Sequence, residues 1–278
     1  MGIDYHGTRF LQYCHVKYGS FEKCVTFGRQ TINIRAGEIP ELQKYVDHKW
    51  SEPFLQEKFG ASEITSLDVS RYQGASIIHD LNVPIPNNLF ELYDTVIDLG
   101  CSEHIMNVFQ AMQNASDLCK VGGTIIHVVP ANNYCGHGFW QFSPILLYEF
   151  YSRERGFKDT EVFLSSPEKK RQWFKVLTNN VGKRLVFRSS CRVYAMVVTK
   201  KIGIQSKKAT TNQPDYLDTW NKNLNKSPPY RGATEAKRRN ELIFQLKRIK
   251  GRLLDFVHRK RKTLHRSNPH LEHIKLDY

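Results

Sequence analysis

The chain has 278 residues, 40% of them hydrophobic, which is enough to bury one large core. The N-terminal sequence MGIDYHGTRF has no apolar signal segment, and no run approaches 18 apolar residues, so we expect a cytoplasmic protein without a membrane-spanning helix. The net charge of +14 is concentrated in residues 200–278, which hold 20 Lys and Arg against 7 Asp and Glu. This distribution predicts a near-neutral globular part followed by a basic appendage.

Six cysteines are scattered along the chain without a C-x-x-C pair. Such spacing is typical neither of a zinc ribbon nor of a disulfide framework. We therefore predict reduced, mostly buried thiols and no metal site.

Short apolar runs alternate with helical patterns in the near-neutral part. Five runs have strand composition: residues 23–28, 63–69, 74–81, 93–100 and 123–129. Near-continuous Val, Ile and Leu suit strands that are covered on both faces, as in a parallel sheet. Apolar residues at helical spacing predict helices over about residues 105–118 and 144–156.

Two further runs, residues 160–164 and 192–201, have strand composition and close the near-neutral part. The polar segment between them contains SPEKKRQWFKVLTNN, in which Ser166–Lys169 could begin a helix with Pro167 at its first position. That segment could cover a pocket or be a surface insertion. Strands and helices that alternate in this way predict an α/β, doubly wound sheet.

Two segments of this pattern carry a family resemblance. A sheet that is parallel except for a closing pair resembles the Rossmann-like, class I S-adenosylmethionine-dependent methyltransferases. Residues 93–105 and 118–130 look like the fourth and fifth strands of that class, with these matching positions: Glu103, His104, Lys120, Gly122 and Gly123. The resemblance covers roughly residues 5–200 and implies a seven-stranded, mostly parallel sheet with helices on both faces.

The segment NNYCGHGFWQFSP, residues 132–144, resembles a bacterial subgroup of the class. In that subgroup a block of the type Gly-His-Gly-aromatic-x-Phe-Ser-Pro follows the fifth strand. The most specific part of the resemblance is residues 93–150.

The resemblance implies S-adenosylmethionine as the cofactor. Members of the class end their first strand with a glycine-rich loop that lets bare backbone approach the ligand, whereas this chain has only Gly28, followed by Arg29 and Gln30. Either the subgroup holds the cofactor differently or its pocket has lost it. The implied cofactor-binding positions are Gly28, Asp68, Asp80, Asp98 and Gly100.

Each of the three acidic positions has a structural alternative. Asp68 would accept hydrogen bonds from the ribose hydroxyls, or cap a helix. Asp80 would lie near the adenine amino group, or serve as a turn residue. Asp98 would face the methyl-donor sulfur, or pair with amides at the end of its own strand.

Histidines supply the candidate catalytic base, because an imidazole titrates near neutral pH. His137, which lies between two glycines, is the leading candidate and His104 the second, with His127 third. The alternatives are a turn histidine bonded to the backbone for His137, a helix-capping residue for His104 and a hydrogen-bonded core histidine for His127.

Aromatic residues surround His137 in the sequence. Tyr134, Phe139 and Trp140, together with Phe142, could form a wall over the methyl acceptor. Aromatic side chains are also ordinary core anchors, and we expect about half of these four to serve only in packing.

We predict three parts: a methyltransferase-like domain at residues 1–201, a linker or arm at 202–232, and a basic amphipathic helix and tail at 233–278. Residues 233–266 could lie on an anionic membrane surface, bind phosphate backbones, or pack on the core or on a second copy. Nucleic acid is the less favoured partner, because the tail shows no RNA-recognition signature. The sequence does not indicate an oligomeric state.

We predict an enzyme that transfers a methyl group from S-adenosylmethionine to a small-molecule or sugar-containing acceptor. The alternative is a non-catalytic, methyltransferase-like binding domain that its basic tail directs to a membrane surface or a polyanion.

Overall fold

The computed structural model describes residues 2–35, 37–46, 48–177, 185, 187–203 and 271–275. The chain divides into two compact units, the first of which comprises residues 1–176, 192–211 and 272–278. The basic helix predicted from residue 233, and nearly all of the linker, lie outside the described residues. No helix among the described residues is long and apolar enough to cross a bilayer.

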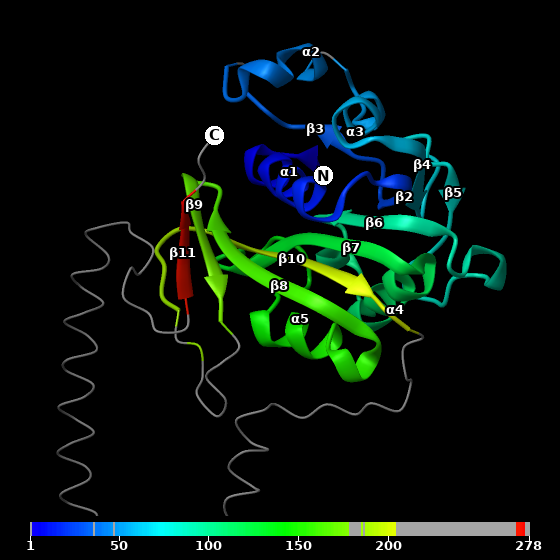
Figure 1. The fold of residues 1–278 in the computed structure, drawn as a ribbon. Coiled ribbons are helices and arrows are strands. Elements are labelled where there is room, and N and C mark those ends of the chain that lie inside the picture. Colours follow the sequence, from blue (N-terminus) through cyan, green and yellow to red (C-terminus); the bar gives the residue numbers. More distant parts are fainter. Residues whose placement is uncertain are drawn as a thin grey trace, which may run out of the picture. The chain divides into compact units, whose positions relative to one another are not determined.

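The described residues form one nine-stranded and one two-stranded sheet (Figure 1). The large sheet contains β2 (Glu22–Phe27), β4 (Ala61–Asp68), β5 (Ile77–Ile78), β6 (Tyr93–Leu99), β7 (Cys119–Asn132), β8 (Phe157–Ser166), β9 (Lys169–Val176), β10 (Val193–Lys201) and β11 (Leu271–Lys275). The small sheet pairs β1 (Gly2–Ile3) with β3 (Thr31–Ile32). The helices are α1 (Tyr5–Tyr18), α2 (Gln43–Val46), α3 (Glu52–Phe59), α4 (Val108–Leu118) and α5 (Pro144–Phe150).

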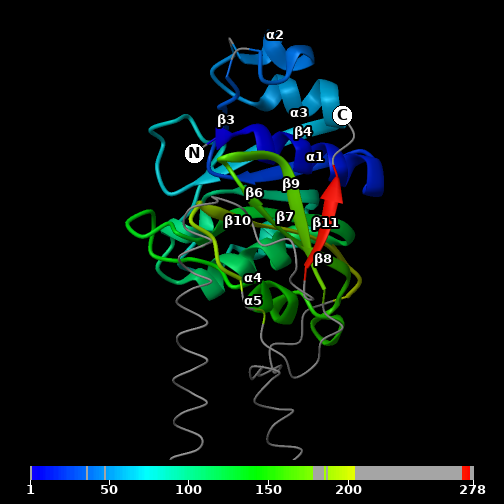
Figure 2. The ribbon, with the colours of Figure 1, turned by 90° about the vertical axis from the view of Figure 1, so that its left-hand side faces the viewer.

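The spatial order of the large sheet is β11-β9-β8-β10-β7-β6-β2-β4-β5. The five strands from β5 to β7 pair in parallel, and β10 then runs antiparallel between β7 and β8. Helices α1 and α3 lie on one side of this sheet, and α4 and α5 on the other (Figures 1 and 2). This is the doubly wound sheet with a closing antiparallel pair that the sequence predicts, so the predicted Rossmann-like fold class is confirmed.

The order of the parallel strands reverses at one point. From β2 the chain moves outward to β4 and β5, and then returns to place β6 on the opposite side of β2. In open α/β sheets, ligands bind outside the carboxyl ends of the strands at such a switch point. A ligand-binding site is therefore expected at the carboxyl ends of β2 and β6.

Two expectations about the closing strands are wrong. The sheet has nine strands rather than seven, because β9 and β11 extend it beyond β8. The helix expected from Ser166 is instead the turn of a β8–β9 hairpin, with Pro167 between the strands. Packing decides this outcome, since Trp173 of β9 is fully buried and its ring contacts Phe10 of α1 and Phe163 of β8.

Helix α1 anchors the core on its side of the sheet. Asp4 caps the helix by accepting a hydrogen bond from Gly7 N at 2.8 Å, which satisfies one of the amides left unpaired at a helix start. Phe10, Leu11 and Cys14 are fully buried and share one helical face. The hydrogen bond from Trp173 Nε1 to His6 Nδ1, at 3.0 Å, joins this helix to the added strand β9.

Truncation of Trp173 tests the β8–β9 hairpin. We expect Trp173→Ala to lower the free energy of unfolding by about 3–5 kcal/mol, because it leaves a cavity against α1. Trp173→Phe should lower the free energy of unfolding less, because it keeps an aromatic ring at this position, although it loses the hydrogen bond to His6. Urea unfolding measures both, with Val121→Ala as the control because Val121 is 52% exposed. Equal midpoints for Trp173→Ala and Val121→Ala would contradict the assignment.

Candidate functional site

Two glycines flank the switch point. Gly28 follows β2 with a φ of 68°, and Gly100 follows β6 with a φ of 84°, both in the left-handed region that favours glycine. Gly28 N also donates to Leu67 O at 2.7 Å, which ties the loop after β2 to β4. Both predicted cofactor glycines therefore lie beside the switch point of the sheet.

Arg29 leads away from Gly28 and connects three segments. Its Nε lies 2.6 Å from Glu52 Oε1 in α3, and its guanidinium donates to Gln73 O at 3.2 Å in the loop after β4. The guanidinium also stacks over the Trp50 ring, 4.4 Å from its centroid. Arg29 therefore bridges the loops that follow β2 and β4.

Gln30 is turned inward beside these residues. It is 1% exposed and donates through Nε2 to Phe27 O at 2.8 Å. Its Oε1 is buried and has no hydrogen-bond partner within the part of the chain that the structure describes. The sequence alone indicates no role for Gln30, because a single glutamine in a loop carries no spacing signal.

Asp68 and Asp80 both form turns. Asp68 ends β4, and its Oδ1 accepts from Ser70 N at 3.0 Å, while no described residue bonds to Oδ2. A turn follows instead of a helix, so the helix-cap alternative is wrong.

Asp80 is exposed, and Asn82 donates to its Oδ1 through N and Nδ2, as the turn-residue alternative expects. These bonds lower the pKa of Asp80.

Asp98 lies at the centre of a buried network. Its carboxylate accepts from Cys101 N at 2.9 Å and from Ser102 Oγ at 2.6 Å, and it lies 2.8 Å from His127 Nδ1. His127 Nε2 in turn lies 2.5 Å from the Tyr151 hydroxyl. Both alternatives read from the sequence are therefore realised: Asp98 pairs with strand-end amides, and His127 is a hydrogen-bonded core histidine.

The network keeps the carboxylate ionised. Complete burial alone would raise the pKa of Asp98, but hydrogen bonds from His127, Ser102 and the Cys101 amide outweigh burial and hold the pKa below its ordinary value. The ionised carboxylate fixes the start of the 3₁₀ turn Ser102–His104. That turn carries the next two site residues.

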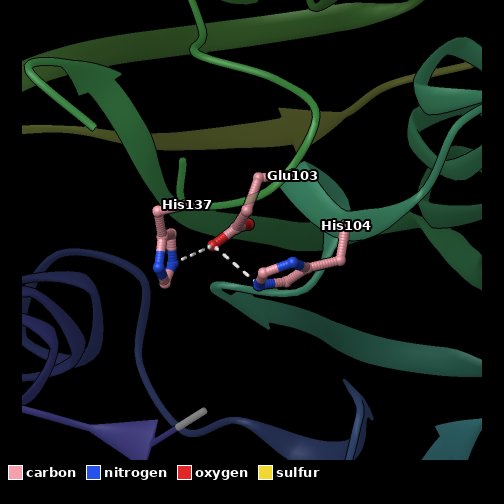
Figure 3. Close-up of side chains that lie close together, drawn as sticks. All are labelled: Glu103, His104 and His137. Atoms are coloured by element: carbon pink, nitrogen blue, oxygen red, sulfur yellow. Dashed lines mark ion pairs between the residues drawn. The ribbon is translucent and has the colours of Figure 1, made fainter. Parts of the chain in front are cut away.

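Glu103, His104 and His137 form one cluster (Figure 3). Glu103 Oε1 lies 3.5 Å from His137 Nε2 and 3.9 Å from His104 Nε2. The Glu103 side chain is 2% exposed, and burial together with the charge of Asp98 raises its pKa to about 8. Burial and the neighbouring His137 lower the pKa of His104. The structure thus brings together the two histidines that the sequence proposed as catalytic.

The loop that carries His137 is held against the 3₁₀ turn by its backbone. Phe139 N donates to Glu103 O at 2.7 Å, and Trp140 Nε1 donates to Ile105 O at 2.9 Å. A Cβ atom at Gly138 would lie 2.7 Å from Glu103 O, so this close approach requires glycine. His137 N also donates to Tyr134 O, which closes the turn.

The four aromatic residues of this loop divide into two pairs. Tyr134 and Phe142 are 7% and 2% exposed, and Tyr134 stacks on Tyr194 of β10. Phe139 and Trp140 are 64% and 40% exposed. The first pair serves in packing, as expected for about half of the four, and the second pair is exposed to solvent.

Glu103 is a site residue that the sequence marks only as a position matching the family pattern, without a role in the site. A signal was present. Glu103-His104 and the Gly-His-Gly sequence around His137 follow neighbouring parallel strands, β6 and β7, whose carboxyl ends meet at one edge of the sheet.

Comparison with known proteins finds no matching family model and no matching curated protein. Among solved structures, 1,6-didemethyltoxoflavin-N1-methyltransferase of Burkholderia thailandensis is 13% identical with a TM-score of 0.41, over 69% of this chain and 76% of that one. A SAM-dependent methyltransferase of Archaeoglobus fulgidus is 13% identical with a TM-score of 0.42, over 69% and 92%. Phosphoethanolamine N-methyltransferase 2 of Haemonchus contortus is 10% identical with a TM-score of 0.45, over 71% and 54%. Because these identities and TM-scores are low, the functional interpretation rests on this chain's own strand order and side chains.

Substitution of Asp98 tests the buried network through its pH dependence. At pH 7 we expect Asp98→Asn to lower the free energy of unfolding by about 2–3 kcal/mol, because it replaces a charged hydrogen-bond acceptor. The folded-state pKa lies below the unfolded value of about 3.9, so this contribution is present above pH 4 and is lost as the pH falls through the folded-state pKa. Urea unfolding between pH 7 and pH 3 should show the difference shrink.

The exposed Asp159 supplies the control, since asparagine also tolerates its positive φ of 53°. Asp159→Asn should change the unfolding midpoint little at any pH. A wild-type to Asp98→Asn difference that stays constant down to pH 3 would show that folding does not lower the pKa of Asp98.

Proposed function

We propose that this chain transfers a methyl group from S-adenosylmethionine to a small-molecule or sugar-containing acceptor. The observation that carries the proposal is the pair Gly28 and Gly100. They flank the switch point of a sheet that has the strand arrangement of the Rossmann-like methyltransferase class.

The residues at this edge fit a polar ligand with hydrogen-bond donors. Asp68 presents an oxygen, Oδ2, to which none of the described residues bonds, and it would accept from the ribose hydroxyls. Buried Gln30 Oε1 and Glu103 Oε2 also lack partners among the residues described. Buried polar atoms without partners are costly, so donors of a bound ligand would stabilise the site.

The cofactor, when bound, supplies an activated methyl group, and the protein has to align the acceptor with it. Exposed Phe139 and Trp140 provide apolar surface for the acceptor beside the loop after β7. His137 and His104 lie at the same edge, and their role in taking the acceptor's proton stays a prediction.

Arg29 favours a second candidate function, a non-catalytic binding domain of the same fold. Its side chain spans the loops after β2 and β4, on either side of the position expected for the ribose. In such a binding domain, the Arg29 side chain, and not a bound cofactor, would hold the loop after β2 against its neighbours.

Titration with S-adenosylhomocysteine decides between the two functions. We expect the full chain to bind it with micromolar affinity, and Asp68→Ala to weaken binding at least tenfold, because a hydrogen bond to a charged group is worth about 1.5–3 kcal/mol. Isothermal calorimetry measures both, on protein shown by circular dichroism to be folded. Glu63→Ala is the matched control, since Glu63 lies on β4 ahead of Asp68 and is 56% exposed.

No binding at millimolar ligand by a folded chain would exclude the enzyme and support the binding domain. Equal affinity for wild type and Asp68→Ala would show that the ligand is held elsewhere.

A further inference from the structure

The cluster of Glu103, His104 and His137 has a geometry that hydrogen bonding does not explain. The distances from Glu103 Oε1 to the two Nε2 atoms, 3.5 and 3.9 Å, exceed the 2.7–3.2 Å typical of an N–H···O bond. The three ligand atoms nevertheless lie within 4.8 Å of one another, and both imidazole rings turn a nitrogen toward the same oxygen (Figure 3).

The carboxyl group itself is unsatisfied. Glu103 is 1% exposed, and its second oxygen, Oε2, has no hydrogen-bond partner in the described part of the chain. An ionised carboxylate buried without donors is costly, and the charge of a bound cation would offset that cost. No described Lys or Arg forms an ion pair with Glu103; its neighbours within ion-pair distance are the two histidines. Among the described residues, therefore, only two histidines lie within ion-pair distance of this buried carboxyl group.

The three residues are also held in place before any ligand arrives. Asp98 fixes the start of the 3₁₀ turn that carries Glu103 and His104. Phe139 N donates to Glu103 O at 2.7 Å, which fastens the His137 loop to that turn. A prearranged set of ligands loses little conformational freedom when it binds an ion.

The donor set and spacing suit a divalent transition metal. Bonds of 2.0–2.2 Å in a tetrahedral arrangement place neighbouring ligand atoms about 3.4 Å apart, close to the distances observed here. Two imidazoles and one carboxylate form the facial set that binds such metals and leaves coordination positions open. Magnesium and calcium prefer oxygen ligands instead. His104 and His137 are 41% and 52% exposed, so an ion can enter from solvent.

We propose that Glu103, His104 and His137 bind one divalent transition-metal ion, with cobalt and zinc as representative ions, and leave positions open for an oxygen ligand. The spacing of the cysteines predicts no metal site, and it does not bear on these ligands, because His104 and His137 stand far apart in the sequence and only the fold brings them together. The proposal does not rest on methyl transfer, but it competes with the predicted role of His104 and His137 as proton acceptors. A bound ion would engage the imidazole nitrogens, so these histidines would then not accept a proton.

The test is calorimetric titration of the full chain with Co²⁺ and with Zn²⁺ after removal of metal by a chelator. We expect one ion per chain and a change in the visible absorption of Co²⁺. His137→Ala, His104→Ala and Glu103→Gln should each weaken this binding by at least about tenfold. His48→Ala is the matched control, since His48 is exposed and lies outside the cluster, and it should leave affinity unchanged.

Folding is checked for each variant by circular dichroism, and exposed His137 and His104 should tolerate alanine. Wild-type affinity in both histidine variants would overturn the proposal, and so would the absence of Co²⁺ and Zn²⁺ binding at millimolar concentration. Tighter binding of Mg²⁺ than of Co²⁺ would also overturn it, because imidazole would then not be the ligand. Binding of Co²⁺ by a chain that ignores S-adenosylhomocysteine would support the metal site while the proposed function fails.

Discussion

The buried carboxylate of Asp98 is the interaction on which the rest of the site depends. It stands at the end of β6, between His127 of β7 and the amides that begin the turn Ser102–His104. Because it is ionised and fully enclosed, its donors cannot be exchanged for water without a large cost. One buried charge therefore fixes the end of β6, the facing part of β7 and the start of the turn that follows β6.

The sequence predicted most of the sheet because the signals involved are local. Each of the five parallel strands is a short apolar run ended by a turn residue, and such runs keep their character wherever the sheet places them. The hairpin of β8 and β9 was missed because KKRQWFKV has no strict alternation, and the burial of Trp173 against α1 decides its conformation. Strand β11 was missed because its pairing with β9 joins distant parts of the chain.

The same distinction applies to the site. Gly28, Gly100, His104 and His137 could be named from their positions after strands and beside turns. Asp98 was given a cofactor role because sequence shows an acidic residue at a strand end but not whether its oxygens already have partners. Glu103 illustrates the opposite case: its high pKa arises from burial and from Asp98, neither of which is visible in the segment CSEHI.

Strand β11 lies at the outer edge of the sheet, beside β9. A chain shortened to residues 1–201 would keep every predicted strand and helix of the domain, yet it would leave the backbone of β9 unpaired along that side. Unpaired edge strands recruit other chains. Residues 271–275 thus cover one side of β9, and self-association of shortened forms would reflect the missing strand rather than a poorly folded core.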